Sequence, residues 1–190
     1  MLDNGIPVRI PPTPRPPGPG VHRRYAAYYA MSASIMLLVG AIWLSTQLRP
    51  STAWHDIALF AHLASLILGF GAVLVADYFF ALWAFGRVPF AEAVRSASRL
   101  HLLVWGGLTG LVASGALLSP NLGSAATIVK LCLVGVLAVN GVHATVLGNR
   151  MALADGPVPF RLLVRGGLTT AVSQLCWWGA VVIGFLNATR

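Results

Sequence analysis

The stretch from Ser124 to Arg150 is long and apolar enough to cross a lipid bilayer, and four other runs of the chain share this character. A bilayer-spanning helix needs about 20 mostly apolar residues. The runs are continuous, whereas membrane strands alternate between apolar and polar residues. We therefore predict five transmembrane helices, near residues 25–48, 56–85, 100–118, 124–150 and 168–187.

Composition favours a polytopic all-α membrane protein with a single transmembrane domain over residues 25–190. Only 9% of the 190 residues are charged, against about 25% in soluble domains. We expect a four-helix bundle with one additional N-terminal helix, surrounded by membrane lipids. A cleaved signal peptide is not expected, because the first apolar run exceeds the roughly 7–15 residues of a signal-peptide core.

Residues 1–24 differ in composition from the rest of the chain. Seven prolines between positions 7 and 19 rule out a packed core. We therefore expect an extended or disordered tail. The same segment could instead lie as a strap along a partner subunit.

The distribution of basic residues predicts the orientation of the chain. A formal net charge of +8 suggests a nucleic-acid partner at first sight. However, the arginines lie mainly in the short segments between apolar runs, as the positive-inside rule describes. An inside N-terminus places ten Lys and Arg residues inside and three outside. We therefore predict a cytoplasmic N-terminus and no nucleic-acid partner.

Five polar side chains inside the predicted helices are the main candidates for a site, because such groups are costly in a membrane. Depth can be counted from the nearest inner arginine at about 1.5 Å of rise per residue. On this scale His101 lies about 3 Å deep, His143 about 10 Å, Gln174 about 13 Å, and Asp77 and Asn140 about 15 Å. We expect them to form one layer in the cytoplasmic half.

Two of these residues are candidate axial ligands of a haem b, which needs two imidazoles at similar depth on facing helices. His101 and His143 differ in depth by about 7 Å on straight helices, a mismatch that helix tilt could absorb. Gly106 and Gly110 could leave space for the macrocycle, with Asn140 close to it.

The same residues also have structural interpretations. The glycine pair is a common helix-packing motif, and the two histidines could be an interfacial and a buried structural group. Asp77 and Gln174 could support the haem ligands or form a proton path. Asp77 could instead be a structural acid paired with an inner arginine such as Arg87, and this interpretation is preferred.

His62 lies about 37 Å from Arg87 along its helix, which exceeds the ~30 Å thickness of the hydrocarbon core. We therefore place it at the outer boundary together with His55. In this arrangement His62 and His101 cannot bind the same metal ion.

Other chemistries have less support. Copper(I) prefers Met and Cys together with His, but Cys132 and Cys176 fall in separate runs and are expected to be buried apolar residues. No HExxH, GxSxG, phosphate-binding glycine loop or CxxC motif occurs. The sequence does not decide whether the protein is an enzyme.

A faint internal repeat relates two parts of the chain. Val88-Pro89-Phe90 precedes Arg95 in the same way as Val158-Pro159-Phe160 precedes Arg165. This spacing predicts two helical hairpins related in parallel.

Three segments resemble the CopD-like superfamily of bacterial inner-membrane proteins, which includes copper-resistance D domains. The segments are HLASLILGFGAVLVADYFFALWAFGR, SRLHLLVWGGLTGLVASGALL and VKLCLVGVLAVNGVHATVLGNR. The resemblance covers roughly residues 57–188. It implies a four-helix bundle in the bacterial inner membrane, with copper handling or haem-linked redox work, and His62 as the metal-binding position. The chain lacks a Met- and His-rich outer face, whereas His101 and His143 favour a use like that of cytochrome b561.

Three functions therefore stay open. The first is a haem b-containing membrane electron carrier, acting on a quinone or a redox partner. The second is a non-catalytic accessory subunit of a larger membrane complex. The third is copper transport of the CopD type.

Overall fold

The computed structural model describes residues 19–152 and 158–188, and within these ranges it contains helices and no strand. All five helices are long and apolar enough to cross a membrane. The predicted all-α fold with five spans is confirmed. The helices are α1 (Pro19–Gln47), α2 (Thr52–Ala84), α3 (Phe90–Leu117), α4 (Ala125–Ala152) and α5 (Phe160–Ala188).

Two of the helices begin much earlier than predicted. The segments before residues 100 and 168 were expected to be loops, but α3 begins at Phe90 and α5 at Phe160. Both helices follow a proline whose carbonyl accepts the first helical N–H bonds: those of Glu92 and Ala93 to Pro89, and those of Leu162 and Leu163 to Pro159. The loop prediction was wrong because Ala, Glu, Arg and Leu favour helix. In both helices the start of the apolar run marks the edge of the hydrocarbon, whereas the helix itself begins about two to three turns earlier.

Helix α1 begins inside the predicted N-terminal tail. Because α1 begins at Pro19, the last part of the tail predicted over residues 1–24 is helical instead. The remainder of that tail, residues 1–18, lies outside the described residues.

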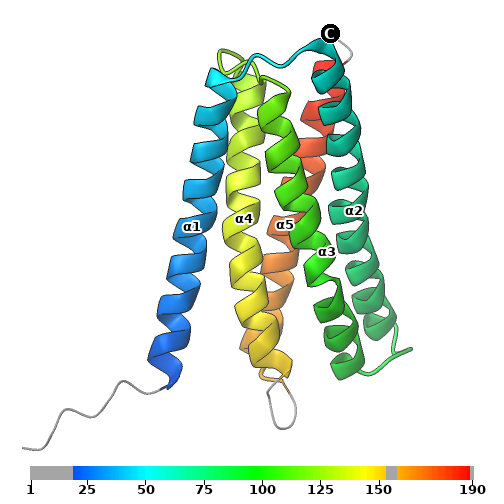
Figure 1. Ribbon diagram of the computed structural model, residues 1–190. Helices are drawn as coiled ribbons and strands as arrows, with labels where there is room; N and C mark the ends of the chain where they lie inside the picture. The colour runs from blue at the N-terminus through cyan, green and yellow to red at the C-terminus, as the bar shows by residue number, and fades with distance from the viewer. Residues whose placement is uncertain (1–18, 153–157, 189–190) are drawn as a thin grey trace, which may run out of the picture.

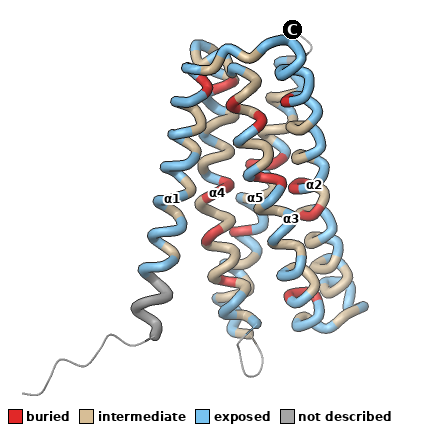
Figure 2. Tube along the Cα trace, viewed as in Figure 1, coloured by how far each residue is buried: buried red, intermediate tan, exposed pale blue. Residues whose placement is uncertain are grey.

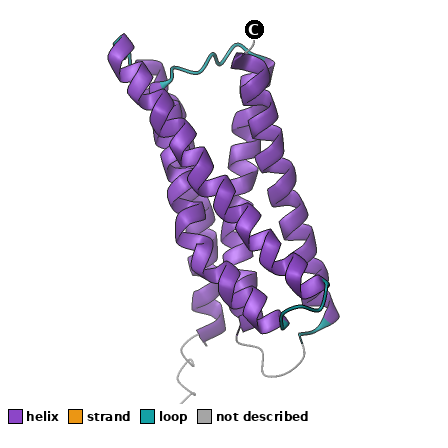
Figure 3. Ribbon diagram, turned by 90° about the vertical axis from the view of Figure 1, so that its right-hand side faces the viewer, coloured by secondary structure: helices purple, strands orange, loops and turns teal. Residues whose placement is uncertain are grey.

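The helices form two close hairpins and a peripheral helix. α2 packs along α3, and α4 packs along α5, while α1 lies against α4 and to a lesser extent α3. The helices run along one common direction and the loops lie at the two ends (Figure 3). In Figure 1, α1 stands at the edge and diverges from α4 toward its own N-terminus. Among its residues with described side chains, only Ser45 is buried (Figure 2).

Glycines bring α2 and α3 into close contact. A Cβ atom at Gly107 would overlap the backbone of Gly69 and Ser65, and one at Gly110 would overlap the Ser65 side chain. By contrast, a Cβ atom at Gly106 would meet nothing within 4 Å. The packing glycines of α3 are therefore Gly107 and Gly110, because small residues let two backbones approach.

An apolar core joins the two hairpins. Phe70 of α2 stacks on Trp177 of α5 with ring centroids 5.5 Å apart, and Trp177 is only 2% exposed. Cys176 is buried in this core, as predicted, whereas Cys132 is exposed. The prediction for Cys132 was wrong because its side of α4 faces away from the core, toward α1. The core consists of Phe70, Leu108, Leu137, Ala138, Cys176 and Trp177.

The two ends of the bundle differ in charge. We call the end at which α2 and α4 finish and α3 and α5 begin the arginine end. The loop between α1 and α2, at the opposite end, carries the exposed Arg49. The exposed residues that define the arginine end are Arg87, Arg95, Arg99, Arg150, Arg161 and Arg165.

Candidate functional site

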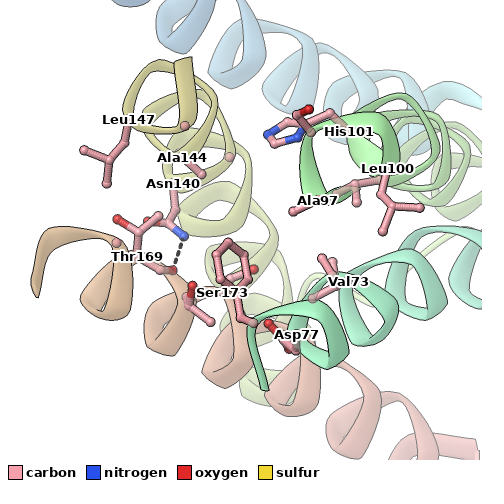
Figure 4. Close-up of a pocket in the computed structure, with 18 of the residues that line it drawn as sticks. Val73, Asp77, Ala97, Leu100, His101, Asn140, Ala144, Leu147, Thr169 and Ser173 are labelled. Atoms are coloured by element: carbon pink, nitrogen blue, oxygen red, sulfur yellow. Dashed lines mark hydrogen bonds between the residues drawn. The ribbon is translucent and has the colours of Figure 1, made fainter. Parts of the chain in front are cut away.

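A cavity of about 190 Å³ lies between the two hairpins, in the half of the bundle nearer the arginine end. All of α2, α3, α4 and α5 contribute to its walls, which are mainly apolar (Figure 4). Its volume is below the ~300–1,000 Å³ typical of pockets for drug-sized ligands, so only a compact molecule would fit. The polar residues that line it are Asp77, Ser98, His101, Asn140, Thr169, Thr170, Ser173 and Gln174.

Asp77 and Gln174 connect the two hairpins across this cavity. The Gln174 Nε2 group donates a hydrogen bond to Asp77 Oδ2, which links α2 to α5. No ion pair involves Asp77 within residues 19–152 and 158–188, so its predicted alternative pairing with Arg87 is not seen. Among the described residues, the partner of the half-buried Asp77 carboxylate is therefore a neutral amide and not a cation.

Asn140 fastens α4 to α5 beside the same cavity. Its Nδ2 group donates a 2.9 Å hydrogen bond to the carbonyl oxygen of Thr169. The sequence pointed to Asn140 but not to Thr169, whose hydroxyl and carbonyl both accept bonds from α4. A buried threonine on the core face of a helix gives no sequence signal that separates it from ordinary packing.

His101 lines the cavity from α3 and extends toward α4 (Figure 4). Because α3 begins at Phe90, His101 lies about 16 Å from the start of its helix. Its predicted depth of about 3 Å, counted from Arg99, stays a prediction, because the earlier start of α3 does not move Arg99. Four of the five residues of the predicted layer, His101, Asp77, Asn140 and Gln174, line this one cavity.

The fifth residue of the predicted layer, His143, faces a different space. It lines an open groove of about 660 Å³ between α1, α4 and α5, which we call the α1–α4–α5 groove. The Thr169 hydroxyl lies 3.4 Å from His143 Nδ1 and donates its proton to the carbonyl oxygen of Arg165. With that proton used, the Thr169 oxygen can accept a hydrogen bond from His143 Nδ1–H. The groove is lined by Met31, Ile35, Cys132, Gly135, Val136, Val139, Asn140, His143 and Val172.

The predicted haem site does not fit this geometry. His101 and His143 border different spaces, and Trp105 packs against Gly141 on the face of α4 that His101 approaches. Neither Gly106 nor Gly110, the predicted space for the macrocycle, lines the cavity.

His62 forms a similar interhelical bond nearer the opposite end. Its Nδ1 atom lies 3.0 Å from the Ser114 hydroxyl, which donates its own proton to the Gly110 carbonyl. His62 therefore donates to Ser114 and ties α2 to α3. His55 is exposed in the first turn of α2. Over residues 19–152 and 158–188, no group of three or more His, Cys, Asp or Glu side chains could hold a metal ion.

Comparisons with known proteins do not assign this chain to a family. No protein-family model, curated protein or solved structure matches it. The function must therefore be inferred from the geometry of the cavity.

Proposed function

We propose that this multi-pass membrane protein binds a small lipophilic amine in the cavity between its two hairpins. The observation that carries this proposal is the position of Asp77. Its carboxylate borders a mostly apolar cavity, and Gln174 is its hydrogen-bond partner within the described ranges. A carboxylate inside a membrane protein is costly unless a proton or a positive group neutralises it, and a bound ammonium group would do so.

The cavity walls suit the apolar part of such a ligand. Trp105 and Trp177 both line the cavity, and indole faces attract cations as well as apolar groups. Trp177 Nε1 is buried with no acceptor among the described residues, and an ammonium group, which only donates hydrogen bonds, would not provide one. His101 and Ser98 supply the polar groups on the α3 side of the cavity.

The arrangement of the hairpins favours a carrier or receptor over a fixed structural role. Each hairpin is fastened internally, by His62 and Ser114 in one and by Asn140 and Thr169 in the other. Between the hairpins, the Asp77–Gln174 bond is the polar link beside the cavity. An ammonium group bound to Asp77 would compete with Gln174 and change how the hairpins meet.

The charge distribution suggests from which side the ligand would enter. The positive-inside rule assigns the arginine end to the cytoplasm, and the resemblance to CopD-like proteins favours the bacterial inner membrane. The cavity would then lie in the cytoplasmic half of the bilayer and take its ligand from that side.

Binding of benzylamine to the purified protein tests this proposal, with toluene as the neutral probe of similar shape. We expect benzylamine to change the fluorescence of Trp105 and Trp177 and to bind at least about tenfold more tightly than toluene. This ratio corresponds to about 1.4 kcal/mol for a charge-assisted hydrogen bond. Asp77→Asn keeps the shape but removes the charge, so it should abolish the preference for the amine.

Asp56→Asn is the matched control for this experiment. It removes the same charge from the same helix, at an exposed position of α2 outside the cavity, and should leave benzylamine binding unchanged. Equal binding of benzylamine and toluene to the unchanged protein would refute the amine proposal. Equal losses in the two variants would show that the effect is not specific to the cavity.

A haem b held by His101 and His143 would require the two imidazoles to reach a common space. Because they border different spaces, we expect the reduced-minus-oxidised visible spectrum of the purified protein to lack the sharp α-band of a low-spin b-type haem. A clear band that is lost in both His101→Ala and His143→Ala would restore the electron-carrier hypothesis. Co-purification of partner proteins in stoichiometric amounts, with no binding of benzylamine, would favour the accessory-subunit hypothesis.

A further inference from the structure

Helices α3 and α5 begin with the same pattern of exposed residues. The sequence is RSASRLHL from Arg95 to Leu102 and RLLVRGGL from Arg161 to Leu168. Residues four and seven apart lie on one face of a helix. The four arginines of the two patterns are exposed, as are Leu102 (80%) and Leu168 (62%). Within the described ranges none of these arginines forms an ion pair.

This pattern matches the vertical order of groups in a phospholipid. Leu168 lies about 5 Å further along α5 than Arg165, in the direction of the hydrocarbon. An exposed arginine pair above an exposed leucine therefore presents guanidinium groups at headgroup depth and apolar surface below. Guanidinium groups bind phosphate oxygens through two parallel hydrogen bonds.

On α5, the exposed face continues into the α1–α4–α5 groove. Val172, one turn beyond Leu168, lines this groove with Met31 and Ile35 of α1. The groove follows α4 from His143 to Cys132, a length of about 16 Å. No residue of α3 lines it, so the equivalent arginines Arg95 and Arg99 lie away from it.

We propose that Arg161 and Arg165 bind the phosphate of an anionic phospholipid, one acyl chain of which fills the α1–α4–α5 groove. The charge of the arginine pair selects an anionic headgroup, and the length and apolar walls of the groove suit an acyl chain. The lipid would also connect α1, which packs only sparsely on the other helices, to the rest of the bundle.

His143 lies deeper than the arginine pair. Its contact with Thr169, one turn beyond Arg165, places the ring about 6 Å below Arg165, at the depth of the esterified glycerol backbone. It therefore does not select the headgroup, which the charge of the arginine pair selects. Phosphatidylglycerol carries a single negative charge, so it is the probe of choice.

Native mass spectrometry of the full-length protein, with equal amounts of phosphatidylglycerol and phosphatidylcholine, tests the proposal. We expect selective retention of one phosphatidylglycerol per chain. The double variant R161Q/R165Q should reduce this retention about tenfold, and R161K/R165K should reduce it less. The matched control R95Q/R99Q removes the same charge from α3 and should retain the lipid.

Two results would overturn the proposal. One is equal retention of the two lipids by the unchanged protein. The other is an equal loss in R161Q/R165Q and R95Q/R99Q, which would indicate general attraction between the arginine end and anionic lipids. If R161Q/R165Q does not fold, the thermal stability of the unchanged protein decides. Phosphatidylglycerol must then raise the midpoint more than phosphatidylcholine does, and R95Q/R99Q must retain that difference.

Discussion

Replacing Gly107 by alanine is expected to destabilise the protein severely, whereas the same replacement at the neighbouring Gly106 should not. The added Cβ atom at Gly107 would overlap backbone atoms of Gly69 and Ser65, and backbone atoms cannot rotate away as a flexible side chain can. Overpacking typically costs about 1–3 kcal/mol, and we expect a cost at or above the upper limit. At Gly106, alanine would meet open space and should stabilise the helix by up to about 1 kcal/mol.

Thermal unfolding in detergent, followed by circular dichroism, measures this difference. Gly107→Ala should lower the midpoint of the transition or prevent recovery of folded protein. Gly106→Ala should equal or exceed the unchanged protein. The same midpoint for the two variants would contradict the close backbone contact between α2 and α3 at Gly107. The pair is informative because the two positions differ by one residue and receive the same methyl group.

Replacing Trp177 by alanine should produce the second large effect, a loss of about 3–5 kcal/mol in stability. Trp177 is 2% exposed and packs on Phe70 of α2. Its indole ring also lies against Gly69, where an added Cβ atom would be 3.1 Å from the ring. Its removal would leave a void where the two hairpins meet. Trp177→Phe should cost much less, because it keeps an aromatic ring and removes an Nε1 group that has no acceptor among the described residues.

Trp178→Ala is the control for this prediction. Trp178 is adjacent in sequence but 51% exposed, and it contacts Phe70 only edge-on. Its loss should cost clearly less than the loss of Trp177 when both variants are unfolded by a denaturing detergent. A larger effect at Trp178 would contradict the assignment of the core to the α2–α5 contact.

The membrane-spanning fold could be predicted because the length and apolar content of a run decide whether a helix can cross a bilayer. The same counting along the helices placed Asp77, Asn140 and Gln174 at a common depth, and all three line the cavity. Helix starts were harder to predict. The continuous apolar run of α3 begins only near residue 100, whereas the helix itself begins at Phe90. The sequence pattern therefore indicated the edge of the hydrocarbon and not the start of the helix.

His143 shows why depth alone does not define a site. A helix turns by about 100° per residue, so Asn140 and His143, three residues apart, point in directions about 60° apart. Ala144 and Leu147 line the cavity, His143 lines the groove, and Asn140 lies at the border and lines both. One haem bound by both histidines would need His143 to face the cavity that His101 lines, whereas His143 faces the groove.

The contacts inside the α2–α3 hairpin have a consequence for how the chain is made. The glycine contacts with Ser65 and Gly69 and the bond between His62 and Ser114 all lie before α4 begins. These two helices can therefore pair in the bilayer while the ribosome is still synthesising the remainder of the chain. The cavity, by contrast, has no complete wall until α5 has been inserted, so the proposed binding of an amine would become possible last during biogenesis.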